Sequence, residues 1–190
     1  MNSLIQLDKQ LFYLINGKWH NAVFDSMMPL LRSSQFWVPL YLFLLLFVLL
    51  NFKKNAWWWA VMAGLTVVLS NFISSDIIKE HIWRTRPCND PELVSSMRFL
   101  LHYRPQSSSF TSSHAVNHFA MATYFYYTLE KHIKKWARLF FLWAFIVVYA
   151  QVYVGVHFPL DVLCGALIGI ILGYLPAKSF NKKYDLAYHV

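Results

Sequence analysis

The chain has 190 residues, of which 57% are hydrophobic, 18% are aromatic and only 14% are charged, and its formal net charge at pH 7 is +8. An ordinary soluble domain is less apolar than this, so the composition argues against a soluble protein and favours one compact unit embedded in a membrane. We expect membrane lipids around the chain and no nucleic acid partner.

The N-terminal part predicts short helices that lie at the membrane surface. Apolar residues recur at roughly helical spacing over residues 3–15, with polar residues such as Asp8 among them, as in an amphipathic interfacial helix. Asn16 and Gly17 should then break this helix. Residues 21–31 predict another short helix, which is too short to cross a bilayer alone. If the two segments join, they could conceal a further span.

Five apolar runs then approach the length of about 20 residues that a helix needs to cross a bilayer. They cover residues 36–50, 56–78, 115–129, 139–156 and 158–176. The expected fold class is all-α, a polytopic membrane helix bundle with five to six transmembrane helices and N-terminal interfacial helices. We divide the chain into these N-terminal helices at 1–34, a transmembrane domain at 35–176 that includes an outer loop at 80–112, and a polar cytoplasmic tail at 177–190.

Positive charge between the runs predicts their orientation, because cytoplasmic loops collect lysine and arginine. Three connections carry such residues: Lys53 and Lys54; Lys131, Lys134, Lys135 and Arg138; Lys178, Lys182 and Lys183. If successive spans cross the membrane in alternating directions, loop 80–112 and the junction at His157 lie on the side opposite the cytoplasm. The loop breaks the charge rule with four arginines, which can bind an anion or contact lipid headgroups: Arg84, Arg86, Arg98 and Arg104.

The cysteines bear on disulfide formation, and the spacing of three glycines bears on helix packing. Cys88 and Cys164 are too few for a disulfide framework, and we expect both to be free thiols. Gly165, Gly169 and Gly173 form a stripe at four-residue spacing that suits close approach of another helix. We expect an internal packing seam in preference to a dimer face, and the oligomeric state is not predicted.

Polar residues that suit anion binding stand near the outer ends of two runs. Lys79 ends the second run, and Arg86 follows after six intervening residues. The ammonium of Lys79, a point charge, and the planar guanidinium of Arg86 should therefore lie at the same edge of the membrane. Ser112, Ser113 and His114 open the third run. Serine caps a helix well, and the free N–H groups at a helix N-terminus favour an anion.

His157 and Asp161 are four positions apart, and Pro159 between them is suited to begin the last helix. A carboxylate so placed can hold one ring nitrogen and orient the other. A neutral imidazole of this kind can attack phosphorus, and a second histidine can protonate the leaving oxygen. Each motif alone also has a structural explanation, but their joint occurrence on one face favours phosphoryl transfer.

These residues resemble the motifs of the type 2 phosphatidic acid phosphatase superfamily, integral-membrane lipid phosphatases. The resemblance covers roughly residues 35–176. The family's lysine, six residues and Arg-Pro correspond to Lys79 and Arg86-Pro87, and its Pro-Ser-Gly-His corresponds to Thr111-Ser112-Ser113-His114. Its third motif is Ser-Arg, five residues, His, three residues and Asp, where this chain has Ala150-Gln151, His157 and Asp161.

The resemblance implies a metal-independent hydrolase that forms a phosphohistidine intermediate and needs no cofactor. It assigns the nucleophile to His157, its orientation to Asp161 and the general acid to His114. The implied phosphate-binding residues are Lys79, Arg86, Ser112, Ser113 and the position of Gln151. Family members usually have six spans, so five would mean that the first is absent or reduced to the N-terminal helices.

Two departures fall in the phosphate pocket. Gln151 stands where the family has arginine, and an amide carries no charge and makes no guanidinium fork. Ser113 replaces glycine and restricts the backbone there. The changes predict a slower enzyme, a pocket in which Arg84 or Arg104 compensates, or a membrane protein that binds lipid phosphate without cleaving it. An engineered glutamine is a further alternative, and activity is the favoured interpretation.

A less favoured hypothesis is a metal-dependent hydrolase. His114 and His118 share one helix face, and His157 with Asp161 would complete four ligands. Lys79 and Arg86 would repel a cation at that place.

For the substrate, we expect a lipid phosphate or diphosphate, with undecaprenyl diphosphate first and phosphatidylglycerol phosphate, phosphatidic acid and lipid A phosphate close behind. The expected location is the bacterial inner (cytoplasmic) membrane, with several passes and the active site on the periplasmic face. The expected role is in lipid metabolism.

Overall fold

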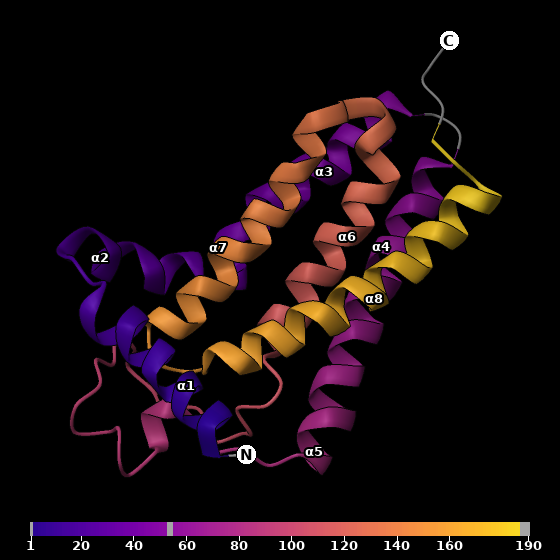
Figure 1. The fold of residues 1–190 in the computed structure, drawn as a ribbon. Helices are drawn as coiled ribbons and strands as arrows, with labels where there is room; N and C mark the ends of the chain where they lie inside the picture. Colours follow the sequence, from indigo (N-terminus) through magenta and orange to yellow (C-terminus); the bar gives the residue numbers. More distant parts are fainter. Residues whose placement is uncertain (1, 53–54, 187–190) are drawn as a thin grey trace.

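The computed structural model describes residues 2–52 and 55–186, and every regular element in these two stretches is a helix (Figure 1). The all-α class is therefore confirmed. Lys53 and Lys54, which contribute to the predicted orientation, and residues 187–190 of the predicted tail lie outside the described residues.

The N-terminal part forms two short helices, as predicted. Helix α1 (Asn2–Tyr13) continues into a π-helical turn η1 (Leu14–Lys18), and α2 (Ala22–Leu31) follows. The helical segment ends after Lys18, next to the break expected at Asn16 and Gly17, and the side chain of Asn16 is buried in tertiary contacts. Its Nδ2 donates to the carbonyl of Tyr153 over 2.7 Å and to that of Arg98 over 2.8 Å, which holds the turn in place.

The long helices begin with η2 (Ser34–Trp37) and α3 (Val38–Asn51), and α4 (Ala56–Asn71) continues through η3 (Phe72–Ile78) into α5 (Lys79–His81). After the outer loop with η4 (Pro87–Asn89) come α6 (Ser113–Ile133), η5 (Lys134–Arg138), α7 (Leu139–Tyr153) and α8 (Pro159–Lys183). Helix α8 runs past the predicted end of its span, so residues 177–183 of the tail are helical.

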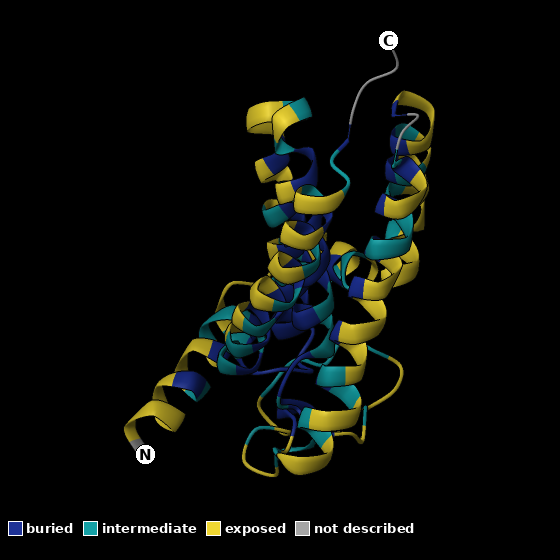
Figure 2. Ribbon diagram, turned by 90° about the vertical axis from the view of Figure 1, so that its right-hand side faces the viewer, coloured by how far each residue is buried: buried dark blue, intermediate teal, exposed yellow. Residues whose placement is uncertain are grey.

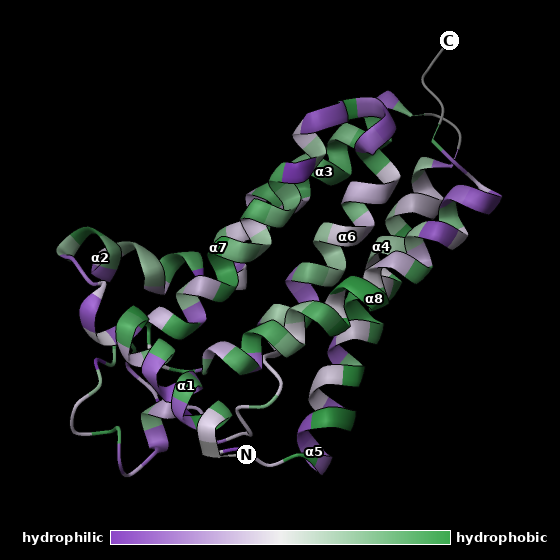
Figure 3. Ribbon diagram, viewed as in Figure 1, coloured by the Kyte–Doolittle hydropathy of each residue, from purple (hydrophilic) through white to green (hydrophobic). Residues whose placement is uncertain are grey.

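Four continuous stretches of the described chain are long and apolar enough to cross a membrane: Ser34–Asn51, Ala56–His81, Ser113–Tyr153 and Pro159–Lys183. The third stretch contains both α6 and α7, which are joined by η5 and lie side by side (Figure 1). Apolar residues dominate the middle of these helices, whereas polar residues gather at η5, at the end of α8 and at the outer loop (Figure 3). The count of five spans remains a prediction.

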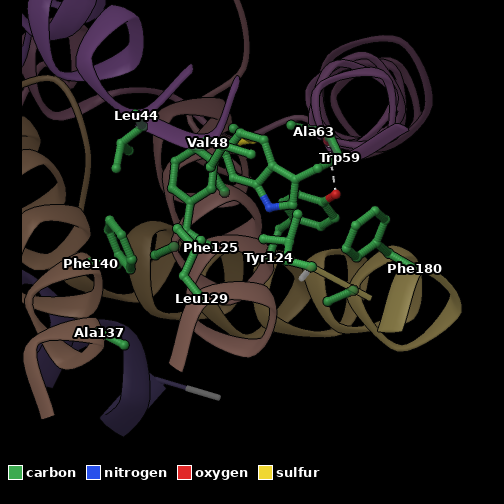
Figure 4. Close-up of a cluster of buried hydrophobic side chains, with 14 of the residues drawn as sticks. Leu44, Val48, Trp59, Ala63, Tyr124, Phe125, Leu129, Ala137, Phe140 and Phe180 are labelled. Atoms are coloured by element: carbon green, nitrogen blue, oxygen red, sulfur yellow. Dashed lines mark hydrogen bonds between the residues drawn. The ribbon is translucent and has the colours of Figure 1, made fainter. Parts of the chain in front are cut away.

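Aromatic side chains form the core between α4, α6 and α7 (Figure 4). Trp59 stacks on Phe125 with ring centroids 5.5 Å apart, and the Tyr124 hydroxyl donates to the Trp59 carbonyl over 2.9 Å. Trp59 in turn donates its indole N–H to Thr128 over 2.8 Å. Trp59 and Tyr124 thus satisfy their polar atoms while they fill space, as is usual for buried tryptophan and tyrosine.

Helices α6 and α8 make the most extensive contact in the bundle, and the glycine stripe lies in it. A Cβ built on Gly173 would come within 2.1 Å of the Ala120 carbonyl oxygen, and one on Gly169 within 2.4 Å of the Val116 carbonyl oxygen. Only glycine allows this approach. The predicted internal seam is therefore confirmed, and it fixes the N-terminus of α6 beside that of α8.

The turn between α7 and α8 packs against the outer loop. Gly155 has a φ of 91°, which favours glycine, and a Cβ there would lie 2.9 Å from the Arg98 carbonyl oxygen. Buried loop segments lie beneath the helices at this end (Figure 2). The loop, α1, and the starts of α6 and α8 therefore meet at one end of the bundle, opposite η5 (Figure 1).

Candidate active site

His157 lies buried between an arginine and a carboxylate. Its Nε2 is 3.0 Å from Nη1 of Arg86, and its Nδ1 faces Oδ2 of Asp161 at 3.7 Å and the hydroxyl of Ser109 at 3.4 Å. Because an arginine can only donate, the neighbouring Nε2 acts as the acceptor, and the ring proton belongs on Nδ1. The Nε2 lone pair is therefore the reactive position of this ring.

Burial lowers the pKa of His157 from 6.5 to about 4, and the charges of Arg86 and Lys79 act in the same direction. Asp161 opposes this shift but does not overcome it. The imidazole is consequently neutral at pH 7, the state in which it can act as a nucleophile.

Asp161 is fully buried and is held by local and distant donors. It caps α8 by accepting the Phe158 N–H over 2.9 Å, and the same oxygen accepts the Ser109 hydroxyl over 2.5 Å. Its other oxygen accepts from Nη1 of Arg84 over 2.6 Å. These bonds fix the carboxylate in one orientation toward His157.

Arg84 connects the site to α1. Its Nη2 donates over 2.5 Å to Asp8, which is also buried and accepts the Leu160 N–H over 2.9 Å. Burial lowers the pKa of Arg84, but Asp161 and Asp8 outweigh burial and raise it. Arg84 is thus committed to two carboxylates and does not replace the arginine missing at position 151.

Arg86 is anchored by the serine-rich end of the outer loop. Its Nε donates to the Ser107 carbonyl over 2.8 Å, and its Nη2 donates to the Ser108 carbonyl over 3.1 Å. Nη1 also donates to the Val156 carbonyl over 3.0 Å. Burial lowers the pKa of Arg86, yet a guanidinium remains charged at pH 7.

The N-terminus of α6 brings in the second histidine. Ser112 is the N-cap and its side chain accepts the Ala115 N–H over 3.4 Å, while the Ser113 hydroxyl lies 3.0 Å from that of Ser75. His114 follows, close enough to His157 for the two rings to interact electrostatically. The structure therefore brings the two predicted histidines to the same end of the bundle.

His118 belongs to the packing and not to a metal site. Its Nδ1 lies 2.9 Å from the His114 carbonyl oxygen, and its ring packs against Trp143 at 5.1 Å between centroids. Within residues 2–52 and 55–186, no three His, Cys, Asp or Glu side chains gather in a way that could hold a metal ion. The metal site that the spacing permits is therefore not formed.

Two cavities lie near the candidate site, and His114 lines one of them. One, of about 460 Å³, is lined by residues of η2, α3, α4 and α6: Ser34, Tyr41, Val67, Asn71, Ser113, His114, Asn117, His118 and Met121. The other, also about 460 Å³, is lined by Ser75, Lys79, Glu80, Trp83, Ser107 and Ser108. Lys79 therefore borders the space beside Arg86, within electrostatic range of both Arg86 and Asp161.

An apolar groove continues from the first cavity along α3 and α4. It has a volume of about 160 Å³ and shares Tyr41, Val67 and Met121 with the cavity at His114. The remaining lining residues are apolar or glycine, such as Leu44 and Gly64. The cavity beside His114, which has both polar and apolar lining residues, thus adjoins an apolar groove between the long helices.

Gln151 is fully buried on α7 and contacts α2. Its Oε1 accepts from Nε of Arg32 over 3.3 Å, and its Nε2 donates to the Arg32 carbonyl oxygen over 3.3 Å. The loop arginine Arg104 is placed elsewhere, since its Nη1 donates to the Cys88 carbonyl over 2.7 Å. Cys88 and Cys164 are both free, as expected.

Three residues of this site were not singled out from the sequence as parts of it: Asp8, Arg32 and Ser109. Asp8 was one polar residue of an interfacial helix. Arg84 was one candidate to compensate for the arginine missing at position 151, and instead it is paired with Asp8 and Asp161. The run of three serines before Phe110 was the available signal for Ser109. Nothing in the local sequence pointed to Arg32.

The fold, with four stretches long and apolar enough to cross a membrane in the described residues, is of the class of multi-pass membrane proteins. Residues 56–185 match the model of the PAP2 superfamily, so the chain belongs to the PAP2 superfamily. The resemblance found in the sequence is confirmed.

Relatives in this family are phosphatases. The chain is 30% identical over 175 residues to the lipid A 4'-phosphatase of Bacteroides thetaiotaomicron, covering 90% of this chain and 76% of that protein. It is also 30% identical over 181 residues to the undecaprenyl-diphosphatase of Sulfolobus acidocaldarius, covering 92% and 79%. The crystal structure of LpxE from Aquifex aeolicus superposes with a TM-score of 0.66 at 32% identity, covering 90% of this chain and 95% of that one.

Proposed function

We propose that the protein hydrolyses a phosphate from a membrane lipid, with His157 as the nucleophile. The observation that carries this proposal is the environment of one ring, with Nε2 3.0 Å from Arg86 and Nδ1 facing Asp161 at 3.7 Å. Such a ring offers an unprotonated nitrogen beside a cation that can hold the phosphate.

In the first step, Nε2 of His157 forms a bond to phosphorus, and the bond between phosphorus and the lipid oxygen breaks. His114 donates a proton to that oxygen, so the lipid leaves as an alcohol or, from a diphosphate, as a monophosphate. In the second step, water attacks the phosphohistidine, His114 takes up the proton and inorganic phosphate departs. Asp161 balances the charge that develops on the His157 ring.

Lys79 and Arg86 would hold the phosphate oxygens, together with Ser112 and the backbone N–H of Ser113 at the N-terminus of α6. This combination of cations and free N–H groups stabilises the charge that builds up in the transition state. The mechanism uses no cofactor and no metal ion.

The groove between α3 and α4 supports a lipid substrate. An amphiphile could place its phosphate in the cavity at His114 while its apolar chain follows Tyr41 and Leu44 toward the bilayer. We propose that the site faces the periplasm from a bacterial inner membrane. The similarity to a lipid A 4'-phosphatase brings lipid A phosphate to the front of the candidates, beside undecaprenyl diphosphate.

The test is phosphate release by purified protein from lipid A phosphate, undecaprenyl diphosphate, phosphatidylglycerol phosphate and phosphatidic acid. We expect turnover of at least one lipid, its loss in His157→Ala, and no change in His102→Ala, which alters an exposed loop histidine. Activity should persist in the presence of a chelator.

A rapid acid-free quench with radiolabelled substrate should trap label on wild type and none on His157→Ala. Failure of wild type to cleave any lipid in the panel would overturn the proposal. Retained lipid binding in such an inert protein would instead support a non-catalytic lipid-phosphate binder.

A further inference from the structure

Position 151 is where the family resemblance calls for an arginine, and here it carries an uncharged amide. Gln151 is fully buried and does not leave this amide unused. Both of its polar atoms contact Arg32 over 3.3 Å, one through the Nε–H of the side chain and one through the backbone carbonyl. The glutamine therefore holds both the backbone and the side chain of a single arginine.

Arg32 is held in place by the packing of α2 as well. The Tyr153 hydroxyl, two positions from Gln151 on α7, donates to Asp25 of α2 over 2.6 Å. The indole N–H of Trp37 donates over 2.8 Å to the carbonyl of Leu31, the residue before Arg32. The first contact holds α2 against the site end of α7, and the second holds the end of α2 against η2.

Arg32 lies next to the groups that anchor Arg86 and close to the cavity at His114. The Gln151 carbonyl accepts the Val156 N–H over 3.2 Å, the Val156 carbonyl accepts from Arg86 over 3.0 Å, and Ser34, two positions after Arg32, lines the cavity. Nη1 and Nη2 of Arg32 make no hydrogen bond or ion pair with the described part of the chain, so four N–H donors remain available. The charge of Arg32 is within electrostatic range of both Arg86 and His114.

Other loop arginines at this end of the bundle are placed differently. Arg84 is paired with Asp8 and Asp161, and Arg98 is paired with Asp25, so carboxylates balance both charges. Arg104 lies beside Cys88, whose carbonyl accepts from its Nη1.

We propose that Arg32 is a phosphate-binding residue of this enzyme and that Gln151 is the positioning residue that holds it toward the substrate. The guanidinium absent from α7 is thus supplied by α2. Arg32 lies before the stretch 56–185 that matches the family model, so this charge comes from a part of the chain outside that match. The inference rests on the proposed function.

The arrangement has a chemical consequence for the transition state. Arg86 would approach the phosphorus from the side of His157, and Arg32 would contact other equatorial oxygens from the side of His114. A guanidinium can bind two oxygens at once through parallel N–H donors. Removal of one such preorganised donor commonly lowers the rate by about 100-fold to 1,000-fold.

The test compares Arg32→Gln, Gln151→Ala and the exchanged double variant Arg32→Gln/Gln151→Arg, with Arg138→Gln as the control at the opposite end. We expect kcat/KM to fall about 100-fold or more in Arg32→Gln and about tenfold in Gln151→Ala, and to be unchanged in the control. The double variant should recover at least tenfold over Arg32→Gln, because it returns a guanidinium to α7.

Inhibition by orthovanadate gives a second readout, since a merely structural role would not change it. The inhibition constant should rise in Arg32→Gln and Gln151→Ala, while the melting temperature in detergent stays close to that of wild type. If Arg32→Gln folds poorly, Arg32→Lys should keep vanadate inhibition within about tenfold while kcat falls, because one charge remains without the planar fork.

An active wild type in which Arg32→Gln keeps kcat/KM and vanadate inhibition within threefold would overturn this inference and leave the proposed function intact. A double variant no better than Arg32→Gln would also contradict it. A wild type that cleaves no lipid would instead remove the proposed function, and this inference would fail with it.

Discussion

Replacement of Asp161 by asparagine should nearly abolish catalysis while the protein still folds. The carboxylate now accepts from Arg84 through one oxygen, and from Ser109 and the Phe158 N–H through the other. An amide has a single oxygen. If that oxygen stays with Arg84, the new NH2 group points at His157.

A donor at this place reverses the tautomer of His157. Its Nδ1 must then accept, the proton moves to Nε2, and the lone pair that faces Arg86 is lost. The same change in a serine protease triad lowers kcat about 10⁴-fold. We expect a loss of this order here, which corresponds to about 5.5 kcal/mol of activation free energy.

The free energy of unfolding should fall much less. Breaking a buried ion pair costs about 3–5 kcal/mol, but Asp8 still holds Arg84 at 2.5 Å, so we expect about 2–3 kcal/mol. The matched control is Asp185→Asn, which removes an exposed ion pair with Lys131 and should cost less than about 1 kcal/mol. Phosphate release and the melting temperature in detergent measure the two effects.

The reasoning on the tautomer is refuted if Asp161→Asn retains a tenth or more of wild-type kcat while Asp185→Asn behaves as described. A variant that unfolds completely would be replaced by Asp161→Glu, for which the charge is kept and the orientation is lost. We then expect an intermediate rate.

Three further predictions concern helix packing, the pH dependence of activity and the pH dependence of stability. Gly173→Val should lower the melting temperature strongly, because even a Cβ would lie 2.1 Å from the Ala120 carbonyl oxygen. The control Gly64→Val should change it little, because a Cβ at Gly64 has no neighbour within 4 Å. Equal effects of the two substitutions would contradict the close packing of α6 against α8. Activity should persist as the pH falls from 7 to 5 and disappear near pH 4, because His157 becomes protonated there and loses its nucleophilic lone pair. A pH profile in which kcat/KM falls with an apparent pKa near 6.5 would contradict this. Because the pKa of His157 is lower in the folded state, its contribution to stability should be lost between about pH 6.5 and 4, as thermal unfolding across this range would show.

The sequence predicted the helices well where one short-range signal determined them. Apolar runs gave the positions of the long helices, and the glycine stripe gave the seam between α6 and α8. The spacing of Lys79 and Arg86 predicted that both lie at one edge of the membrane, and in the structure the two charges are within electrostatic range of each other. The helix break expected at Asn16 and Gly17 falls after Lys18, but the sequence did not predict that the Asn16 amide bonds to the carbonyls of Tyr153 and Arg98.

The nearest partners of the catalytic candidates were decided by the tertiary structure alone. Arg32 and Gln151 are 119 positions apart, and Arg84 is 77 positions from Asp161. Leucine-rich and valine-rich runs specify that helices form, but they are too similar to specify which polar residues at their ends will meet. That choice depends on the close approach of α6 and α8 and on how α1 and α2 fold over the outer loop.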